Sequence, residues 1–359
     1  MKLFSLLIFA LFLINGVYSQ SRIQELGEKL STAKDKEKGD LFNDIGKEYC
    51  FQGDFDNAKN YFFQALRNHE EFNDKKGIAK TLNNIGVIYL YQSDYKSALE
   101  YYSKSLRIDE DNDNFEGMAH TLSNLGLIHF YLDNMGKALQ YYQQSYELYN
   151  KIGFENDKAN ALYNIGQTYY QSDQLEDAVS KYMQAIEIYN KVNDKKGIAN
   201  VSYYLGMVYC EENDYKKATE YFDKALIASD ESANMTLKAQ ILTAYGKLLN
   251  KKEDVKGAIL QIEQSIKICN ENDLPNLQVN NYKLCSEYYE ALADYQKALE
   301  YFKLYTDKRN EVFEEENLMQ IFELQKKYEL EKKEKDIELL KKEKEIYELK
   351  FQIDSIKNK

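Results

Sequence analysis

The chain has 359 residues, of which 44% are hydrophobic and 30% charged, enough for a sizeable buried core. The chain contains one proline, no tryptophan and 32 tyrosines. Because so few helix-breaking residues interrupt the chain, an all-helical fold is favoured. The formal net charge is -12, which repels phosphate backbones and anionic lipid surfaces unless a local basic patch is present. We find no such patch and expect no nucleic-acid partner.

Residues 1–19 are typical of a secretory signal peptide. Lys2 supplies a positive start, the run from Leu3 to Ile14 is apolar apart from Ser5, and Val17 and Ser19 fit a signal peptidase site. The run is shorter than the roughly 20 apolar residues that span a bilayer. We therefore predict cleavage after Ser19, with an uncleaved anchor helix as the alternative. The mature chain is expected to be exported and not to span a membrane.

Residues 20–38 are the next predicted element, an N-terminal capping helix. Ile23, Leu26 and Leu30 lie at helical spacing within residues 22–32. A stack of repeats buries its core only between neighbouring units, so an end unit needs such a cap.

A constant period then organises residues 39–310 into seven repeats. A small residue recurs at one position, as Gly46, Gly86, Gly126, Gly166, Gly206, Gly246 and Ser286. An alanine follows each of them at a fixed interval, as Ala58, Ala98, Ala138, Ala178, Ala218, Ala258 and Ala298. A large apolar residue follows one helical turn further on, as Phe62, Tyr102, Tyr142, Tyr182, Phe222, Ile262 and Phe302.

Each repeat is predicted to form two antiparallel helices. In the second repeat, apolar residues at helical spacing run from Leu82 to Leu90 and from Tyr95 to Leu106, separated by a polar turn. Gly86 and Ala98 are small because the two helices approach closely there. The ring of Tyr102 is expected to fill the gap to the following repeat.

This pattern resembles the tetratricopeptide repeat family, and the resemblance covers about residues 39–310. It implies an all-α, right-handed superhelical solenoid of about seven helix-turn-helix repeats that binds a protein or peptide and is not an enzyme. Two features depart from the family. The interval from Gly46 to Gly86 is longer than the family's usual period of roughly 34 residues, and the proline that commonly closes a unit is absent. A longer second helix in each repeat would explain both.

The resemblance also implies a concave groove lined by the first helices, with an asparagine two positions before the small residue. Here that position holds Asn84, Asn124 and Asn164, whose amides can both donate and accept hydrogen bonds. The alternative is that they hydrogen-bond to neighbouring helices. Tyrosines complete the predicted groove over repeats two to five: Tyr91, Tyr131, Tyr163, Tyr170 and Tyr203. We find no cluster of lysine and arginine that would clamp a terminal carboxylate.

Residues 311–359 are predicted to form a long charged helix. Pairs such as Glu338 and Lys342 lie one helical turn apart in the stabilising order. Leu339, Ile346 and Ile353 have heptad spacing, which is typical of a coiled coil that would join two chains. A single helix packed on the last repeat is the alternative. The segment also resembles the stalk of bacterial sensor proteins with exported tetratricopeptide domains, although no membrane helix or output domain follows it in this sequence.

We therefore expect an exported binding module, in the periplasm of a Gram-negative bacterium or secreted. It would act as an adaptor or as the sensing part of a signalling system, and whether it is a shortened sensor or stands alone is left open. The alternative is an envelope scaffold that dimerises through residues 311–359.

No catalytic residue, metal site or cofactor is expected. No nucleophile elbow or zinc-protease motif is present, and the histidines are too far apart in sequence to act together: His69, His120 and His129. The four cysteines are expected to be small buried residues. Cys50 and Cys210 are several repeats apart and cannot form a disulfide within one chain, whereas a bridge between Cys269 and Cys285 is left open.

Overall fold

The structure, a computed structural model, describes residues 21–314 together with residues 332, 335, 337 and 340–342. The predicted signal peptide and most of the predicted charged helix lie outside the described residues. Export, cleavage after Ser19 and the coiled coil of residues 311–359 therefore stay predictions. The chain forms two compact units, Met1–Lys252 and Glu253–Lys359.

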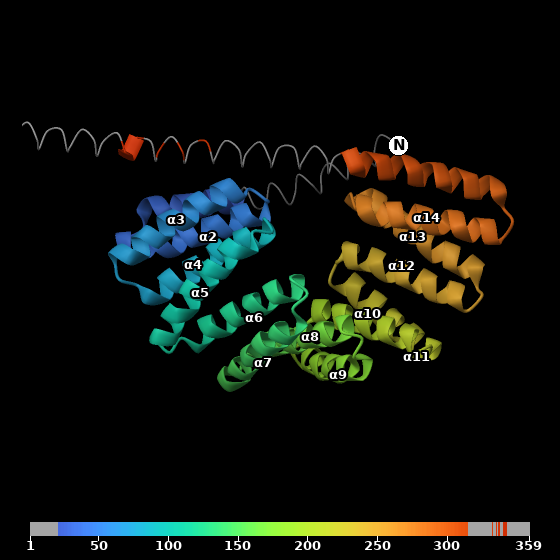
Figure 1. Cartoon of the computed structure of the whole chain (residues 1–359), viewed down its shortest axis with the longest axis horizontal. Helices are drawn as coiled ribbons and strands as arrows, with labels where there is room; N and C mark the ends of the chain where they lie inside the picture. Colours follow the sequence, from blue (N-terminus) through green and yellow to red (C-terminus); the bar gives the residue numbers. More distant parts are fainter. Residues whose placement is uncertain (1–20, 315–331, 333–334, 336, 338–339, 343–359) are drawn as a thin grey trace, which may run out of the picture. The chain divides into compact units, whose positions relative to one another are not determined.

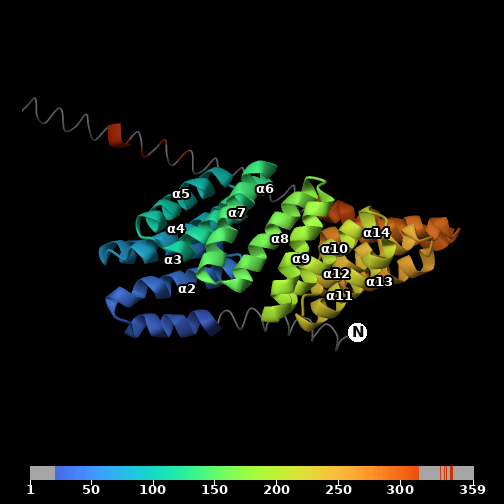
Figure 2. The ribbon, with the colours of Figure 1, turned by 90° about the horizontal axis from the view of Figure 1, so that it is seen from below.

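All regular secondary structure in the described residues is helical, as the sequence predicted. In the first unit a helix at residues 21–32 and the short 3-10 helix η1 (Asp35–Glu37) come first. They are followed by α2 (Lys38–Phe51), α3 (Phe55–Glu71), α4 (Lys75–Tyr91), α5 (Tyr95–Asp111), α6 (Phe115–Tyr131), α7 (Met135–Ile152), α8 (Glu155–Gln171), α9 (Leu175–Val192), α10 (Lys195–Glu211), α11 (Tyr215–Glu231) and α12 (Met235–Lys251). Neighbouring helices pack most extensively in pairs, α2 with α3 through α10 with α11 (Figures 1 and 2).

The turns between these helices share one conformation. In the turn that ends α4, Ser93 has a left-handed φ of 57°, and in the turn that ends α5, Asp113 has a φ of 52°. In seven of the ten turns between α2 and α12 the side chain of the next residue caps the following helix, as where Asp94 Oδ1 accepts a hydrogen bond from the Ser97 N–H at 3.1 Å. From α4 to α12 every helix has 17 or 18 residues. The two helices of a repeat are therefore about equally long.

In the first five repeats the repeating glycine lies directly against a buried ring of its own helix pair. A Cβ atom on Gly86 would lie 2.6 Å from the ring of Tyr102, which is fully buried. Tyr102 also packs against Leu125 and Ile128 of the next pair. The ring therefore fills space inside its own repeat as well as the predicted gap to the following one. The same contact recurs at 2.6–2.7 Å at Gly46, Gly126, Gly166 and Gly206.

Many of the tyrosines stabilise the repeats themselves. The rings of Tyr89 and Tyr101 stack with centroids 5.4 Å apart, and the rings of Tyr209 and Tyr221 repeat this contact at 5.5 Å. The ammonium group of Lys59 lies 4.7 Å from the Tyr89 ring. Stacking and cation–π attraction each contribute to such contacts, so the abundance of tyrosine is not by itself a sign of a binding surface.

The first helices of the pairs also touch one another. α4 contacts α2 and α6, and α10 contacts α8 and α12. The first helices of neighbouring repeats therefore lie side by side and share one surface of the first unit. This arrangement brings residues at equivalent positions of successive repeats next to one another.

The second unit contains α13 (Val255–Asn272), α14 (Pro275–Ala291) and a helix at residues 295–314. Ser286, which occupies the small-residue position, donates a hydrogen bond from its hydroxyl to the Ala298 carbonyl oxygen at 3.0 Å. Cys269 and Cys285 are buried and free, so no disulfide joins them here, and Cys50 and Cys210 are free as well. Within the described parts of both units, no helix combines the length and apolar character that crossing a bilayer requires.

Candidate functional site

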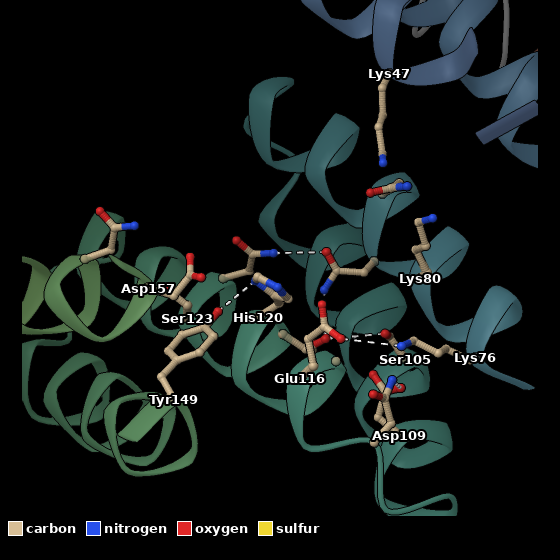
Figure 3. Close-up of a pocket in the computed structure, with 17 residues that line it drawn as sticks. Lys47, Lys76, Lys80, Ser105, Asp109, Glu116, His120, Ser123, Tyr149 and Asp157 are labelled. Atoms are coloured by element: carbon tan, nitrogen blue, oxygen red, sulfur yellow. Dashed lines mark hydrogen bonds and ion pairs between the residues drawn. The ribbon is translucent and has the colours of Figure 1, made fainter. Parts of the chain in front are cut away.

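A polar pocket of about 420 Å³ opens on the surface formed by the first helices (Figure 3). Side chains from α2, α4, α6 and α8 line it, together with residues of α5 and α7. Its charged residues are Lys47, Lys76, Lys80, Asp109, Glu116 and Asp157. Its amide side chains are Asn83, Asn84, Asn114, Asn124 and Asn160. The pocket therefore offers charges of both signs and many hydrogen-bonding groups.

Two of the three predicted groove asparagines, Asn84 and Asn124, line this pocket. The Asn124 amide donates from Nδ2 to Asn83 Oδ1 at 3.1 Å, and the Asn84 amide donates to Asn43 Oδ1 at 3.3 Å. These bonds join neighbouring first helices, which was the alternative role considered for them. Their own side-chain oxygens accept no hydrogen bond from the described residues, so they remain able to accept one from a ligand N–H.

Three lysines, Lys47, Lys76 and Lys80, also line the pocket. Each lies near an acidic partner: Lys76 is 3.4 Å from Glu116, Lys80 is 3.3 Å from Asp40, and Lys47 is 3.5 Å from Asp44. Lys47 lies on α2 and the other two lysines lie on α4. Only the packing of these helices brings the three together.

Asp109 is almost fully buried in the pocket lining, with 2% of its surface exposed. Its carboxylate accepts a hydrogen bond from Asn114 Nδ2 at 2.6 Å. Gly117 gives the carboxylate room, since a Cβ there would lie 2.4 Å from it. Burial raises the pKa of Asp109 from its ordinary value of 3.8 to about 6, while the Asn114 hydrogen bond and the charge of Lys76 act in the opposite direction.

Replacing Asp109 with asparagine is expected to stabilise the protein at neutral pH. Because the pKa is higher in the folded state, the native protein binds more protons between about pH 4 and 6, and wild-type stability falls as the pH rises through that window. The gain at pH 7 should be on the order of 1–2 kcal/mol, since the open pocket screens part of the effect. Urea unfolding from pH 4 to 7.5 measures it. Asp111→Asn, at an exposed position of the same helix, should leave this pH dependence intact.

The remaining predicted groove residues lie outside the pocket lining, in two other places. Tyr163, Tyr170 and Tyr203 surround Tyr204, with ring centroids 5.8, 6.0 and 5.1 Å from it. Burial raises the pKa of Tyr203 to about 12, so its hydroxyl stays protonated. The Tyr170 hydroxyl donates a hydrogen bond to Glu211.

The other two tyrosines are exposed at the carboxyl ends of α4 and α6. Tyr91 stacks on Phe55 at 5.9 Å and Tyr131 on Tyr95 at 6.4 Å. Asn164 also lies outside the pocket lining, and its carbonyl oxygen accepts a hydrogen bond from Thr168. The eight predicted residues thus do not form a single continuous lining.

Most of the pocket's charged residues were not among the predicted groove residues, although the sequence carries a signal for them. Lys80 and Lys76 precede Asn84 by one and two helical turns, and His120 and Glu116 precede Asn124 by the same intervals. Residues at these spacings share one face of a helix. His120 is held there by the Tyr149 hydroxyl, 2.7 Å from its Nδ1 atom (Figure 3).

The described residues contain no group of three or more histidine, cysteine, aspartate or glutamate side chains that could hold a metal ion. The chemistry of the pocket lies in hydrogen bonding and charge pairing. Such a lining binds and orients the polar groups of a ligand.

Stacked helix pairs with a polar pocket on their first helices define a helical-repeat binding protein. Residues 40–111 and 117–191 match the model of the tetratricopeptide repeat family. These two segments therefore contain tetratricopeptide repeats, as the resemblance seen in the sequence implied for this part of the chain. Repeats of this kind are generally binding modules for proteins or peptides. A comparison with curated protein sequences gave no significant match.

Solved structures share the fold. A signal transduction ATPase with a tetratricopeptide repeat sensor from Pyrococcus horikoshii has 18% identity and a TM-score of 0.67, over 77% of this chain and 43% of that one. Aspartyl phosphate phosphatase F from Bacillus subtilis has 17% identity and a TM-score of 0.58, over 76% and 72%. A Rap protein complexed with Competence and Sporulation Factor has 16% identity and a TM-score of 0.57, over 82% and 81%. At these identities the likeness shows the fold alone.

Proposed function

We propose that this chain is an exported module that binds a segment of a partner protein or peptide in the polar pocket of its first unit. It would act as an adaptor or as the sensing part of a bacterial signalling system. The signal-peptide pattern of residues 1–19 supports export. The Rap protein of similar fold, solved with Competence and Sporulation Factor bound, supports the binding role by analogy of fold.

The observation that carries the proposal is the composition of the pocket. Amide groups from consecutive first helices lie beside one another, joined by the bond from Asn124 to Asn83. The side-chain oxygens of Asn84 and Asn124 suit the N–H groups of an extended peptide backbone, whatever its side chains are. Lys76, Lys80 and Glu116 line the same pocket, so a ligand with charges of both signs would be recognised.

Blocking the pocket is expected to abolish partner binding. Ser123 lines the pocket and is only half-buried, so Ser123→Arg places a long charged side chain where the ligand would lie without filling the helix core. The same change at Ser103, an exposed residue of α5 outside the lining, is the matched control. The purified chain and both variants are used to capture partners from an envelope extract, which are identified by mass spectrometry.

A partner retained by the wild type and by Ser103→Arg, but reduced at least tenfold on Ser123→Arg, would support the pocket as the binding site. Circular dichroism establishes that all three proteins are equally helical. Equal retention by all three would rule the pocket out and direct attention to other surfaces of the chain.

A further inference from the structure

A second groove, of about 470 Å³, lies on the first unit between α9 and α11, over the amino-terminal half of α10. It shares no lining residue with the polar pocket. Met183 and Ile186 line it from α9, Ser202 from α10, and Ile227 and Ala228 from α11. We call these five residues and the space between them the aliphatic groove.

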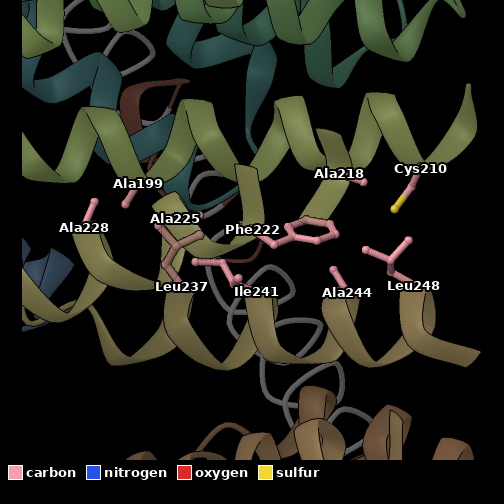
Figure 4. Packing of buried hydrophobic residues seen from close by; sticks show 10 residues of the cluster. All are labelled: Ala199, Cys210, Ala218, Phe222, Ala225, Ala228, Leu237, Ile241, Ala244 and Leu248. Carbon is pink, nitrogen blue, oxygen red and sulfur yellow. The ribbon is translucent and has the colours of Figure 1, made fainter. Parts of the chain in front are cut away.

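Two residues of the aliphatic groove are smaller than their counterparts in other repeats. Ser202 occupies the position held by Leu82, Leu122, Leu162 and Leu242, and all four of these leucines are buried. Ala228 occupies the position held by Ile108, Leu148, Ile188 and Ile268. Figure 4 shows Ala228 at one end of the buried cluster, next to Ala199. Two large aliphatic side chains of the repeat pattern are thus absent from the lining of one groove.

Two residues at the rim of the groove are apolar where other repeats are polar. Ile227 is 62% exposed, and in the other six repeats its position is charged: Arg67, Arg107, Glu147, Glu187, Lys267 and Asp307. Met183 is 44% exposed, and its position is polar in most other repeats, as Ser103, Gln143, Asp223, Glu263 and Lys303. A single exposed aliphatic residue is ordinary, but four departures from the repeat pattern meet in one groove.

Ser202 and two lysines that line the same space, Lys195 and Lys224, show what kind of ligand fits. The Ser202 hydroxyl is completely buried and has no hydrogen-bond partner among the described residues, a state that a bound acceptor or donor would relieve. Lys195 forms an ion pair with Glu231 at 2.8 Å. Lys224 lies over the Tyr221 ring at 4.7 Å and has no carboxylate within ion-pair distance in the described part of the chain.

We propose that the aliphatic groove binds a partner protein by accepting one leucine or isoleucine side chain next to an acidic residue. The aliphatic side chain would occupy the space that Ser202 and Ala228 leave, between Met183 and Ile227. The backbone of the inserted segment would hydrogen-bond to the Ser202 hydroxyl, and the acidic residue would pair with Lys224. A buried aliphatic anchor with a charged rim is the usual anatomy of a protein-binding hot spot.

The test uses a phage-displayed library of random dodecapeptides, selected on the full wild-type chain. Peptides that also bind the double variant Ser202→Leu/Ala228→Ile, which restores the side chains of the other repeats, are discarded. The enriched peptides should share a leucine or isoleucine close in sequence to an aspartate or glutamate. The synthetic consensus peptide should bind the double variant at least tenfold more weakly, and Lys224→Gln several-fold more weakly, in isothermal titration calorimetry.

The double variant should melt at the same temperature as the wild type or higher, because it inserts residues that the repeat already accommodates. Ile227→Glu, which copies Glu187 of the preceding repeat, provides a second variant that leaves the core untouched and should also weaken binding. Ser123→Arg, in the polar pocket, should not change the affinity. Binding at the aliphatic groove can therefore be tested independently of whether the polar pocket binds a partner.

Three outcomes would overturn the proposal. One is that no peptide prefers the wild type to the double variant. Another is a consensus without the aliphatic or the acidic residue. The third is a shift of the Met183 methyl signal in NMR spectra on adding octanoate while no peptide is enriched, which would make the groove a site for a small amphiphile rather than a protein.

Discussion

Replacing Phe222 with alanine is expected to lower the free energy of unfolding of the first unit by about 3–5 kcal/mol. The ring is fully buried between α10, α11 and α12 (Figure 4). It packs against Ile241 and Leu248 and lies 5.8 Å from the Tyr245 ring. Alanine would remove all of these contacts and leave a cavity that the rigid helix pairs cannot close. Chemical denaturation followed by circular dichroism, with hydrogen exchange of α10 to α12, measures the loss.

Phe302 provides the matched control because it holds the same repeat position in the second unit. It is 50% exposed, so Phe302→Ala should cost less than about 1 kcal/mol. The contrast between two identical substitutions isolates the effect of burial by the following helix. Equal losses at both positions would contradict the argument, and would mean that another chain or segment covers Phe302 in solution.

A single methyl group at Gly126 is expected to destabilise the protein by about 1–3 kcal/mol. The Cβ atom of Gly126→Ala would lie 2.7 Å from the buried ring of Tyr142. Neither group can move freely, because Tyr142 also packs against Ala138 and Ile165. The overpacking therefore outweighs the gain in helix propensity that alanine normally brings. Thermal and urea unfolding of the two proteins give the difference.

Gly136→Ala is the control for this substitution. Nothing lies within 4 Å of a Cβ atom at Gly136, which is exposed in the first turn of α7, so alanine should stabilise the protein by about 0.4–1 kcal/mol. A second check is the Tyr142→Leu background, where the cost of Gly126→Ala should shrink because the ring is gone. A stabilising effect of Gly126→Ala in the wild type would show that helix propensity rather than close packing governs the position.

The period of the sequence was enough to predict the repeats because each repeat packs mainly on its neighbours. Gly86, Ala98 and Tyr102 have counterparts at the same spacing in other repeats, and the contact between Gly86 and Tyr102 that this implies is present. The turn at Gln92, Ser93 and Asp94 was likewise predictable from its polar residues. These features depend on local helix geometry and on contacts to the adjacent helix, and residue spacing predicts both.

The pocket was only partly predictable. The resemblance to the tetratricopeptide repeat family implied that Asn84 and Asn124 lie on the groove surface of the first helices, and both line the pocket. The sequence did not show that Lys47 of α2 and Asp109 of α5 lie in the same lining. It also did not show that the asparagine amides already donate hydrogen bonds to neighbouring helices. Which side chains converge depends on how successive helix pairs are stacked.

The sequence by itself determined the helical repeat, its buried positions and the face that its first helices present. The tertiary structure decided which departures from the repeat matter. Ser202 and Ala228 belong to different helices and look unremarkable singly, yet they line one groove between α9 and α11. The physical reason is that periodicity records which side of a helix is buried, whereas a pocket or groove exists only where several helices meet and leave space unfilled.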